Sequence, residues 1–196
     1  MGLYLFKEGN YVLHSSAINV NDKAFIFMGP SGSGKSSLIA SLLNYGELIT
    51  EDISKIEFSG DDAYVYPSLP VIKLDDKIFD YHKFETLKEF DLKGDLRKRK
   101  GYVVKNFDNN NLPLRIQGCF ILENKNSGEI DRVSSDIAFS NLLLNSLGAL
   151  PRNECIKSEN MLLQNISNFI KSVPIYKLSI QKNFSNKIIL DFISKC

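Results

Sequence analysis

The residues most able to do chemistry lie in one short segment, from Gly29 to Ser36, which reads GPSGSGKS. The spacing Gly-x-x-x-x-Gly-Lys-Ser is typical of loops whose backbone N–H groups surround nucleotide phosphates, while the lysine reaches the β- and γ-oxygens and the serine binds Mg²⁺. The alternative is a glycine-rich turn without a ligand. We predict a site for ATP and Mg²⁺. The predicted nucleotide-binding residues are Gly29, Ser31, Gly32, Ser33, Gly34, Lys35, Ser36 and Ser37.

An acidic pair is the second candidate for chemistry. Glu51 and Asp52 follow the apolar segment 48–50, which is predicted to be the strand after the phosphate-loop helix. In a parallel sheet the carboxyl end of that strand opens onto the same crevice as the loop. A carboxylate there can hold Mg²⁺ or accept a proton from an attacking hydroxyl. We predict the base or metal role for Asp52, with Ser36 as the other metal ligand. The role of Glu51 stays open, as does the alternative that both acids only decorate a loop.

A histidine and a basic run border these motifs. His14 closes the apolar segment 11–13. If its strand lies beside the strand before the loop, the imidazole reaches the γ-phosphate region or orients the acidic pair; the alternative is a hydrogen-bonded packing residue. The run from Arg97 to Lys100 is either a solvated loop or a lid that neutralises phosphate or docks an acidic substrate.

The elements that must position these residues follow from apolar periodicity and turn signals. A strand-rich first half precedes a helix-rich second half, which predicts an α/β fold with added β-hairpins. The predicted strands are 11–19, 24–28, 48–50, 56–58, 63–66, 112–123 and 174–180. The predicted helices are 36–45, 79–90, 134–147, 159–173 and 185–194, with a variable loop at 93–111 and a turn at 124–128.

Composition narrows the class of protein. A chain of 196 residues, 43% hydrophobic and 24% charged, suits one domain covering 1–196. A formal net charge of +1 provides no field that would attract nucleic acid. No apolar run approaches the roughly 18 residues of a membrane span, so no membrane partner is expected. Three cysteines, Cys119, Cys155 and Cys196, lack metal-ligand spacing, and their odd number predicts a reducing, cytoplasmic location.

Several segments together resemble the HPr kinase/phosphorylase-like P-loop kinases, most closely the short members of that family. They are HSSA at 14–17, GPSGSGKSS at 29–37, TEDIS at 50–54, YPSLPVIKL at 66–74, LPLRIQGCFIL at 112–122 and SVPIYKLSI at 172–180. The resemblance implies a P-loop core of the type related to phosphoenolpyruvate carboxykinase, with a mixed sheet, added β-hairpins and flanking helices. It also implies transfer of phosphate from ATP, with Mg²⁺, to a serine hydroxyl of a protein or peptide, and homo-oligomers among the expected assemblies.

The resemblance also assigns catalytic roles. Gly34, Lys35 and Ser36 match the family's phosphate and metal ligands, His14 matches its histidine before the P-loop strand, and Asp52 matches the second residue of its Asp-Asp pair. Of these, His14, Lys35 and Asp52 are predicted to be catalytic. Glu51 stands where the family has the first Asp and completes the predicted catalytic set. If that first acid is the base, the longer side chain displaces its carboxylate by about one methylene, and misplacement on that scale is costly. Phosphorylase activity is not expected, because the sequence does not show the full segment that bifunctional members use for it.

Two other functions remain open. A nucleotide-binding regulatory module or pseudokinase would result if Glu51 prevents the chemistry. A small-molecule or nucleoside monophosphate kinase would share the length and the loop, although such enzymes begin with the strand before the loop, and here residues 1–23 come first. ABC-type ATPases are excluded, because the chain has neither a Leu-Ser-Gly-Gly-Gln segment nor an apolar strand ending in Asp-Glu.

Overall fold

The computed structural model describes residues 2–8, 10–75, 87–92, 99–105, 112–123, 128–149, 159–179 and 186–196. The strands are β1 (Tyr11–Leu13), β2 (Ser15–Val20), β3 (Lys23–Met28), β4 (Glu47–Thr50), β5 (Ser54–Ser59), β6 (Asp62–Val65), β7 (Val71–Leu74), β8 (Leu87–Phe90), β9 (Lys100–Val104), β10 (Leu114–Glu123), β11 (Ile130–Arg132) and β12 (Ile175–Ser179). The helices are α1 (Gly2–Lys7), α2 (Lys35–Leu42), α3 (Ser135–Ala149), α5 (Glu159–Ser172) and α6 (Asn186–Ile193).

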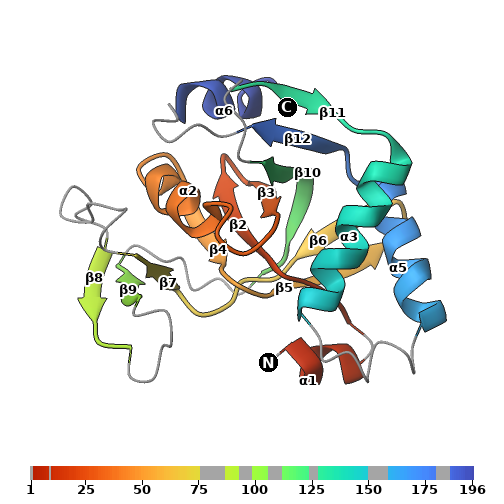
Figure 1. The fold of residues 1–196 in the computed structure, drawn as a ribbon, viewed down its shortest axis with the longest axis horizontal. Coiled ribbons are helices and arrows are strands. Elements are labelled where there is room, and N and C mark those ends of the chain that lie inside the picture. Colours follow the sequence, from red (N-terminus) through yellow and green to blue (C-terminus); the bar gives the residue numbers. More distant parts are fainter. Residues whose placement is uncertain are drawn as a thin grey trace.

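A mixed sheet forms the centre of the molecule, with helices on both faces (Figure 1). Within the ranges given above, nine strands belong to it, in the order β1-β5-β6-β10-β3-β2-β4, with β12 and then β11 added beside β10. A separate small sheet has the order β7-β9-β8. Figure 1 shows α2 and the small sheet on one side, α3 and α5 on the other, and α6 beside β11 and β12.

The central strand β3 is buried on both faces, because successive side chains of a strand point to opposite sides. Ala24, Ile26 and Met28 join the core shared with α3 and α5. Phe25 and Phe27 join the core shared with α2, α6 and the small sheet. This strand therefore holds the two layers together and brings the glycine loop, residues 29–34, to the carboxyl edge of the sheet.

The strand β2 sets the relation between the glycine loop and the acidic pair. It is antiparallel to β3 on one side and to β4 on the other. The strands β3 and β4 consequently run in the same direction, although they are not neighbours. Their carboxyl ends lie at the same edge of the sheet, as the sequence predicted for a parallel sheet, but with the N-terminal end of β2 between them.

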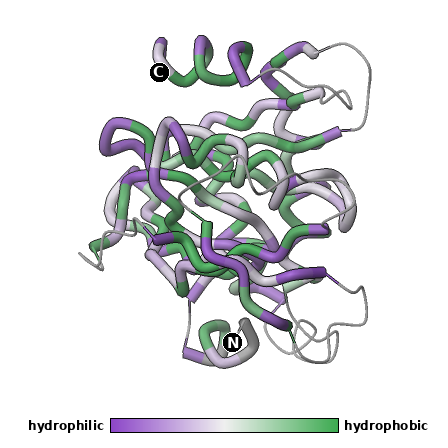
Figure 2. Tube along the Cα trace, turned by 90° about the vertical axis from the view of Figure 1, so that its left-hand side faces the viewer, coloured by the Kyte–Doolittle hydropathy of each residue, from purple (hydrophilic) through white to green (hydrophobic). Residues whose placement is uncertain are grey.

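The long strand β10 joins the two halves of the sheet. Its first residues pair antiparallel with β6, and its later residues pair parallel with both β3 and β12. Phe120 stacks on Phe27 at 5.2 Å and on Tyr176 at 5.6 Å between ring centroids, and meets the edge of Phe192 at 5.7 Å. One buried ring thus contacts β3, β12 and α6. Figure 2 shows α6, near the C-terminus, alternating between hydrophobic and hydrophilic residues, as expected of a helix with one buried side.

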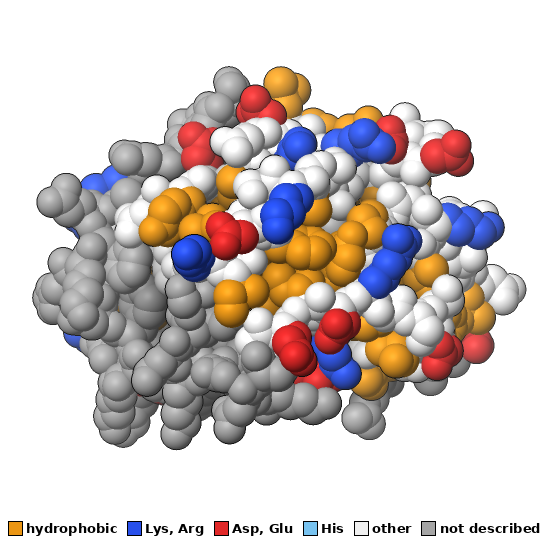
Figure 3. All heavy atoms as spheres, turned by 90° about the horizontal axis from the view of Figure 1, so that it is seen from above, with side chains coloured by type: hydrophobic (Ala, Val, Ile, Leu, Met, Phe, Trp, Pro, Cys, Tyr) orange, Lys and Arg blue, Asp and Glu red, His pale blue; other side chains and the backbone are white. Residues whose placement is uncertain are grey.

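The end of the molecule formed by α6 and the β11–β12 edge is seen in Figure 3. Apolar side chains occupy the centre of this view, and charged side chains lie around them. Among the residues that the structure describes, no helix has the length and apolar character needed to cross a membrane.

Most predicted elements are confirmed with small shifts of their ends. The predicted strand 11–19 is instead two strands, because the backbone N–H of His14 donates to the carbonyl oxygen of Asn145 in α3, at 3.0 Å, and the chain bends there. β1 then pairs with β5, whereas β2 pairs with β3 and β4.

Two predictions for the chain between β7 and β10 were wrong in the parts that the structure describes. The predicted helix 79–90 is the strand β8 at 87–90, and the predicted loop 93–111 contains the strand β9 at 100–104, because these strands pair with each other and β9 pairs with β7. The remaining parts of these two predictions lie outside the described residues, at 79–86, 93–98 and 106–111. The same holds for residues 124–127 of the predicted turn and for Cys155.

Candidate functional site

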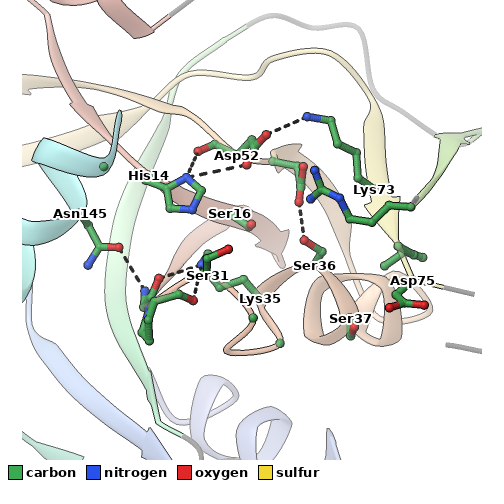
Figure 4. A pocket seen from close by; sticks show the side chains of 18 of the residues that line it. His14, Ser16, Ser31, Lys35, Ser36, Ser37, Asp52, Lys73, Asp75 and Asn145 are labelled. Atoms are coloured by element: carbon green, nitrogen blue, oxygen red, sulfur yellow. Dashed lines mark hydrogen bonds and ion pairs between the residues drawn. The ribbon is translucent and has the colours of Figure 1, made fainter. Parts of the chain in front are cut away.

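A cleft of about 1380 Å³ lies at the carboxyl ends of β3 and β4 (Figure 4). Its walls come from the glycine loop and the start of α2, from the acidic pair after β4, from α3, and from the small sheet. The predicted residues that line it are His14, Gly29, Ser31, Gly32, Gly34, Lys35, Ser36, Ser37, Glu51 and Asp52. The structure therefore brings both predicted motifs and the histidine to one cavity.

The glycine loop depends on backbone angles that other residues rarely adopt. Gly32 has a φ of +84° and Gly34, the N-cap of α2, has a φ of +92°. A Cβ atom at either position would meet nothing within 4 Å, so glycine is required by conformation and not by space. The loop leads directly into α2, whose N-terminal N–H groups and dipole favour an anion at this point.

Lys35 is folded over the loop. The residue is 7% exposed, and its Nζ donates to the carbonyl oxygens of Gly29 at 2.8 Å and Pro30 at 3.1 Å. Its ammonium group lies beside the loop, where an anion bound by the backbone would be neutralised.

Ser33 differs from the other predicted loop residues, because it is absent from the cleft wall. Its N–H donates to the carbonyl oxygen of Pro30 at 3.1 Å. Its hydroxyl lies close to the backbone of Gly29, where a Cβ would approach it to 3.1 Å. The N–H of Gly29 also has an acceptor, Oδ1 of Asn145 at 3.3 Å, so α3 anchors the start of the loop.

Glu51 contacts the predicted metal-binding hydroxyl. The Oγ of Ser36 donates to Oε1 of Glu51 at 2.5 Å. Burial raises the pKa of Glu51 to about 6; the charge of Asp52 acts in the same direction, and the Ser36 hydrogen bond and nearby cations oppose it. The sequence predicted Asp52 as the metal partner of Ser36, but in this structure Glu51 is the acid that contacts Ser36.

The donor set fits Mg²⁺. A hydroxyl and a carboxylate are hard oxygen ligands, and Mg²⁺ often takes only one or two ligands from the protein and the rest from phosphates and water. Among the described residues there is no group of three or more His, Cys, Asp or Glu side chains able to hold a metal ion.

Asp52 lies in a different electrostatic environment from Glu51. Its backbone has a φ of +77°, a left-handed conformation that Asp tolerates better than most residues. Its Oδ2 accepts from Nζ of Lys73 at 2.8 Å. Burial acts to raise the pKa of Asp52, but the hydrogen bond and charge of Lys73, together with the charges of His14 and Arg99, hold the pKa below its ordinary value. Asp52 is therefore ionised at neutral pH.

His14 is fixed against the acidic pair and α3. Its Nδ1 lies 3.0 Å from the backbone carbonyl oxygen of Asp52 and 3.7 Å from Oδ1 of the same residue. Because a carbonyl oxygen can only accept, Nδ1 carries a proton. On the other side, a Cβ at Gly148 would lie 3.6 Å from the Cβ of His14, so α3 packs closely there. The predicted contact between the histidine and the acidic pair is present.

Sequence reasoning missed three polar residues of the cleft wall as functional candidates: Ser16, Lys73 and Asn145. Arg99, which the sequence offered as part of a possible lid, also lines the cleft. Ser16 and Lys73 lie inside segments that carry the family resemblance, and Arg99 lies in the basic run. Lys100 of the same run pairs with Glu89 at 2.9 Å and is absent from the cleft wall, and residues 97 and 98 lie outside the described ranges. The available signal for Asn145 was its place, together with Ser146, between leucines of the predicted helix 134–147.

Comparisons with known proteins support the architecture. Neither the protein-family models nor the curated proteins contain a match to this chain. Among solved structures, the Hpr(Ser) kinase/phosphatase from Coxiella burnetii is similar, with a TM-score of 0.51 over 94% of this chain and 88% of that chain. The two sequences are 8% identical. A likeness at this identity shows a shared fold, here a mixed α/β fold with flanking helices, so the roles of individual residues rest on the cleft itself.

Proposed function

We propose that this protein is a kinase that transfers the γ-phosphoryl group of ATP to a serine hydroxyl of a protein or peptide. One observation carries the proposal: the glycine loop with Lys35 and the carboxylate of Asp52 line the same cleft. Phosphoryl transfer needs a phosphate cradle and a residue that orients the attacking hydroxyl, and little else from the protein. The shared fold with an Hpr(Ser) kinase/phosphatase supports serine as the acceptor.

The loop, α2 and Lys35 bind the nucleotide in this proposal. Backbone N–H groups of the loop hold the α- and β-phosphates, and Lys35 turns from the loop carbonyls to the β- and γ-oxygens. Ser36 and Glu51 would hold Mg²⁺, which, when bound, neutralises charge on the phosphates. This assignment gives Glu51 the metal role and leaves Asp52 for the proton.

Asp52 accepts the proton of the serine hydroxyl. The hydroxyl oxygen forms a bond to the γ-phosphorus, the bond from that phosphorus to the β,γ-bridging oxygen breaks, and the proton passes to Oδ1 of Asp52 while Oδ2 stays on Lys73. A carboxylate with a lowered pKa is a weak base, but a loose transition state requires orientation of the hydroxyl more than early deprotonation. His14 positions Asp52 by donating from Nδ1 to its backbone carbonyl oxygen.

A second function, nucleotide binding without transfer, is favoured by one contact. The ion pair between Lys73 and Asp52 occupies one carboxylate oxygen and lowers the basicity of the group. A protein in which this pair persists with ATP bound would hold the nucleotide and leave it intact.

Labelling with ATP that carries a radioactive γ-phosphate tests these functions. The enzyme, Mg²⁺ and a library of peptides with one serine each are incubated together, and phosphoserine is identified by mass spectrometry. We expect label with the wild-type protein and none with Lys35→Met or Asp52→Asn, of which the second still binds ATP in calorimetry. Lys100→Met is the matched control, because Lys100 pairs with Glu89 away from the cleft, and it should label normally.

Other outcomes assign other functions. Tight ATP binding with no label on any peptide supports the nucleotide-binding module. Label on GMP, included as a separate acceptor, supports a nucleoside monophosphate kinase. Undiminished peptide labelling by Asp52→Asn removes Asp52 from the proposed mechanism.

A further inference from the structure

A buried hydroxyl at the base of the cleft has no hydrogen-bond partner among the described residues. Ser16 is 1% exposed, and no described residue forms a hydrogen bond with its Oγ. A buried hydroxyl without a hydrogen bond is unfavourable, so such groups are rare in folded proteins. The preceding residue, Ser15, is equally buried but donates to Oγ of Ser54 at 2.7 Å. Of these two neighbouring serines, the one that lacks a hydrogen bond is the one that lines the cleft.

The position of Ser16 indicates what its partner is. Ser16 lies at the N-terminal end of β2, where it is paired with Phe27, two residues before the glycine loop. Because β2 runs between β3 and β4, this end of the strand lies between the loop and the acidic pair. Figure 4 shows the Ser16 side chain between His14 and Lys35, with Ser36 and Asp52 nearby.

In the proposed complex, the γ-phosphoryl group is the part of ATP that would lie between the glycine loop and the acidic pair. Loop N–H groups bind the α- and β-phosphates, and the lysine reaches the β- and γ-oxygens. The γ-phosphoryl group must also face Asp52 if it is to be transferred to a hydroxyl that Asp52 orients. A hydroxyl at the floor between Lys35 and the acidic pair is then a donor directed at that group.

We propose that Ser16 donates a hydrogen bond to the γ-phosphoryl group of bound ATP and thereby makes the site discriminate between ATP and ADP. This proposal rests on the nucleotide binding of the proposed function, but it does not depend on the acceptor or on transfer. The unsatisfied hydroxyl of the free protein gains its partner only when the third phosphate is present.

Calorimetric titration with two nucleotides tests the proposal. Two ligands are used: ADP, and the analogue of ATP that has an imido group between its β- and γ-phosphates. Each is titrated, with Mg²⁺, into the wild-type protein, Ser16→Ala and Ser15→Ala. We expect Ser16→Ala to weaken binding of the ATP analogue about tenfold, as for one hydrogen bond to a charged group, and to leave binding of ADP unchanged. Ser15→Ala is the matched control and should keep the wild-type ratio of the two affinities.

Unfolding in urea separates this role from a structural one. Ser16→Ala removes a hydroxyl without a partner, so its midpoint should be no lower than that of the wild type. Ser15→Ala breaks the bond to Ser54 and should have a lower midpoint. The proposal is overturned if Ser16→Ala keeps the wild-type ratio of the two affinities, whether neither affinity changes or both fall equally. The proposed function stands in that case. A wild-type protein that binds neither nucleotide overturns both.

Discussion

At the scale of single residues, the adjacent acids Glu51 and Asp52 have opposite electrostatic environments. Glu51 is buried against Ser36 and its pKa is raised, whereas Asp52 is paired with Lys73 and its pKa is lowered. The positive φ of Asp52 turns the backbone between them, so that neighbouring side chains meet different groups. The charged form of Glu51 therefore lowers the stability of the fold, whereas the charged form of Asp52 raises it.

We predict that Glu51→Gln stabilises the nucleotide-free protein at neutral pH. The pKa of Glu51 is about 6 in the folded protein and 4.5 for the ordinary group, so the folded state binds the proton more tightly. Stability therefore falls as pH rises from about 4.5 to about 6, and above that range the charged form costs about 2 kcal/mol. In urea unfolding at pH 7.5, Glu51→Gln should have a higher free energy of unfolding than the wild type. This difference should vanish below pH 4.5. Equal stability of the two proteins at pH 7.5 would contradict the burial of a charged Glu51.

We predict the opposite sign for Asp52→Asn. Because the pKa of Asp52 is lowered, its charged form contributes stability that is present above the ordinary pKa and lost as pH falls through the lowered value. The variant should be less stable than the wild type in urea at pH 7.5 and approach it at low pH. Asp62→Asn is the control, because Asp62 pairs with the largely exposed Arg115 and such pairs contribute little. A stabilised Asp52→Asn would contradict the assigned ion pair.

At the scale of elements, the ring of Phe120 connects β10 with β3, β12 and α6. We predict that Phe120→Ala lowers the free energy of unfolding by about 3–5 kcal/mol, because a fully buried ring is lost and a cavity stays behind. Tyr45→Ala removes an aromatic ring that is 56% exposed and should change stability by less than about 0.5 kcal/mol. Urea denaturation measures both, and a small effect at Phe120 would mean that α6 is not packed on the sheet in solution.

Local patterns were enough to predict the elements around the site. The strand before the loop, the helix after it and the hairpin of β5 and β6 are each determined by periodicity and turn residues within a few positions. The segment 87–90 was misassigned because the sequence 79–90 has an amphipathic pattern typical of a helix, whereas pairing with β9 makes 87–90 a strand. Sheet order was not predictable, since it depends on contacts such as that of β3 with β10, about 90 residues apart.

For the candidate site, too, local motifs could be predicted from the sequence and long-range contacts could not. The loop and the acidic pair are each contiguous in the sequence, so both could be recognised as candidates without a structure. Lys73 and Asn145 reach the cleft from distant elements, β7 and α3, and no local pattern predicts such an approach. The carboxylate that contacts Ser36 was also not predictable, because it depends on how the backbone bends at Asp52.

At the scale of the whole molecule, ATP should stabilise the fold as a unit, because its proposed site is built from the loop, the acidic pair after β4, α3 and the small sheet. With Mg²⁺ and ATP at 100 times the dissociation constant, we predict a gain of about 2.7 kcal/mol, which corresponds to a rise in melting temperature of roughly 5–10 °C for a chain of this size. Differential scanning calorimetry measures the shift. Lys35→Met should show little or none, and an equal shift in that variant would contradict the role of Lys35.

The hydrogen bond from Gly29 to Asn145 links residues 116 positions apart. During synthesis on a ribosome, the glycine loop emerges early, but neither its sheet neighbour β10 nor its anchor on α3 exists until much later. Contacts of such long sequence separation form late and slowly. The glycine loop of the nascent chain therefore lacks these two supports until β10 and then Asn145 have been synthesised, and we expect nucleotide binding to begin only after that point.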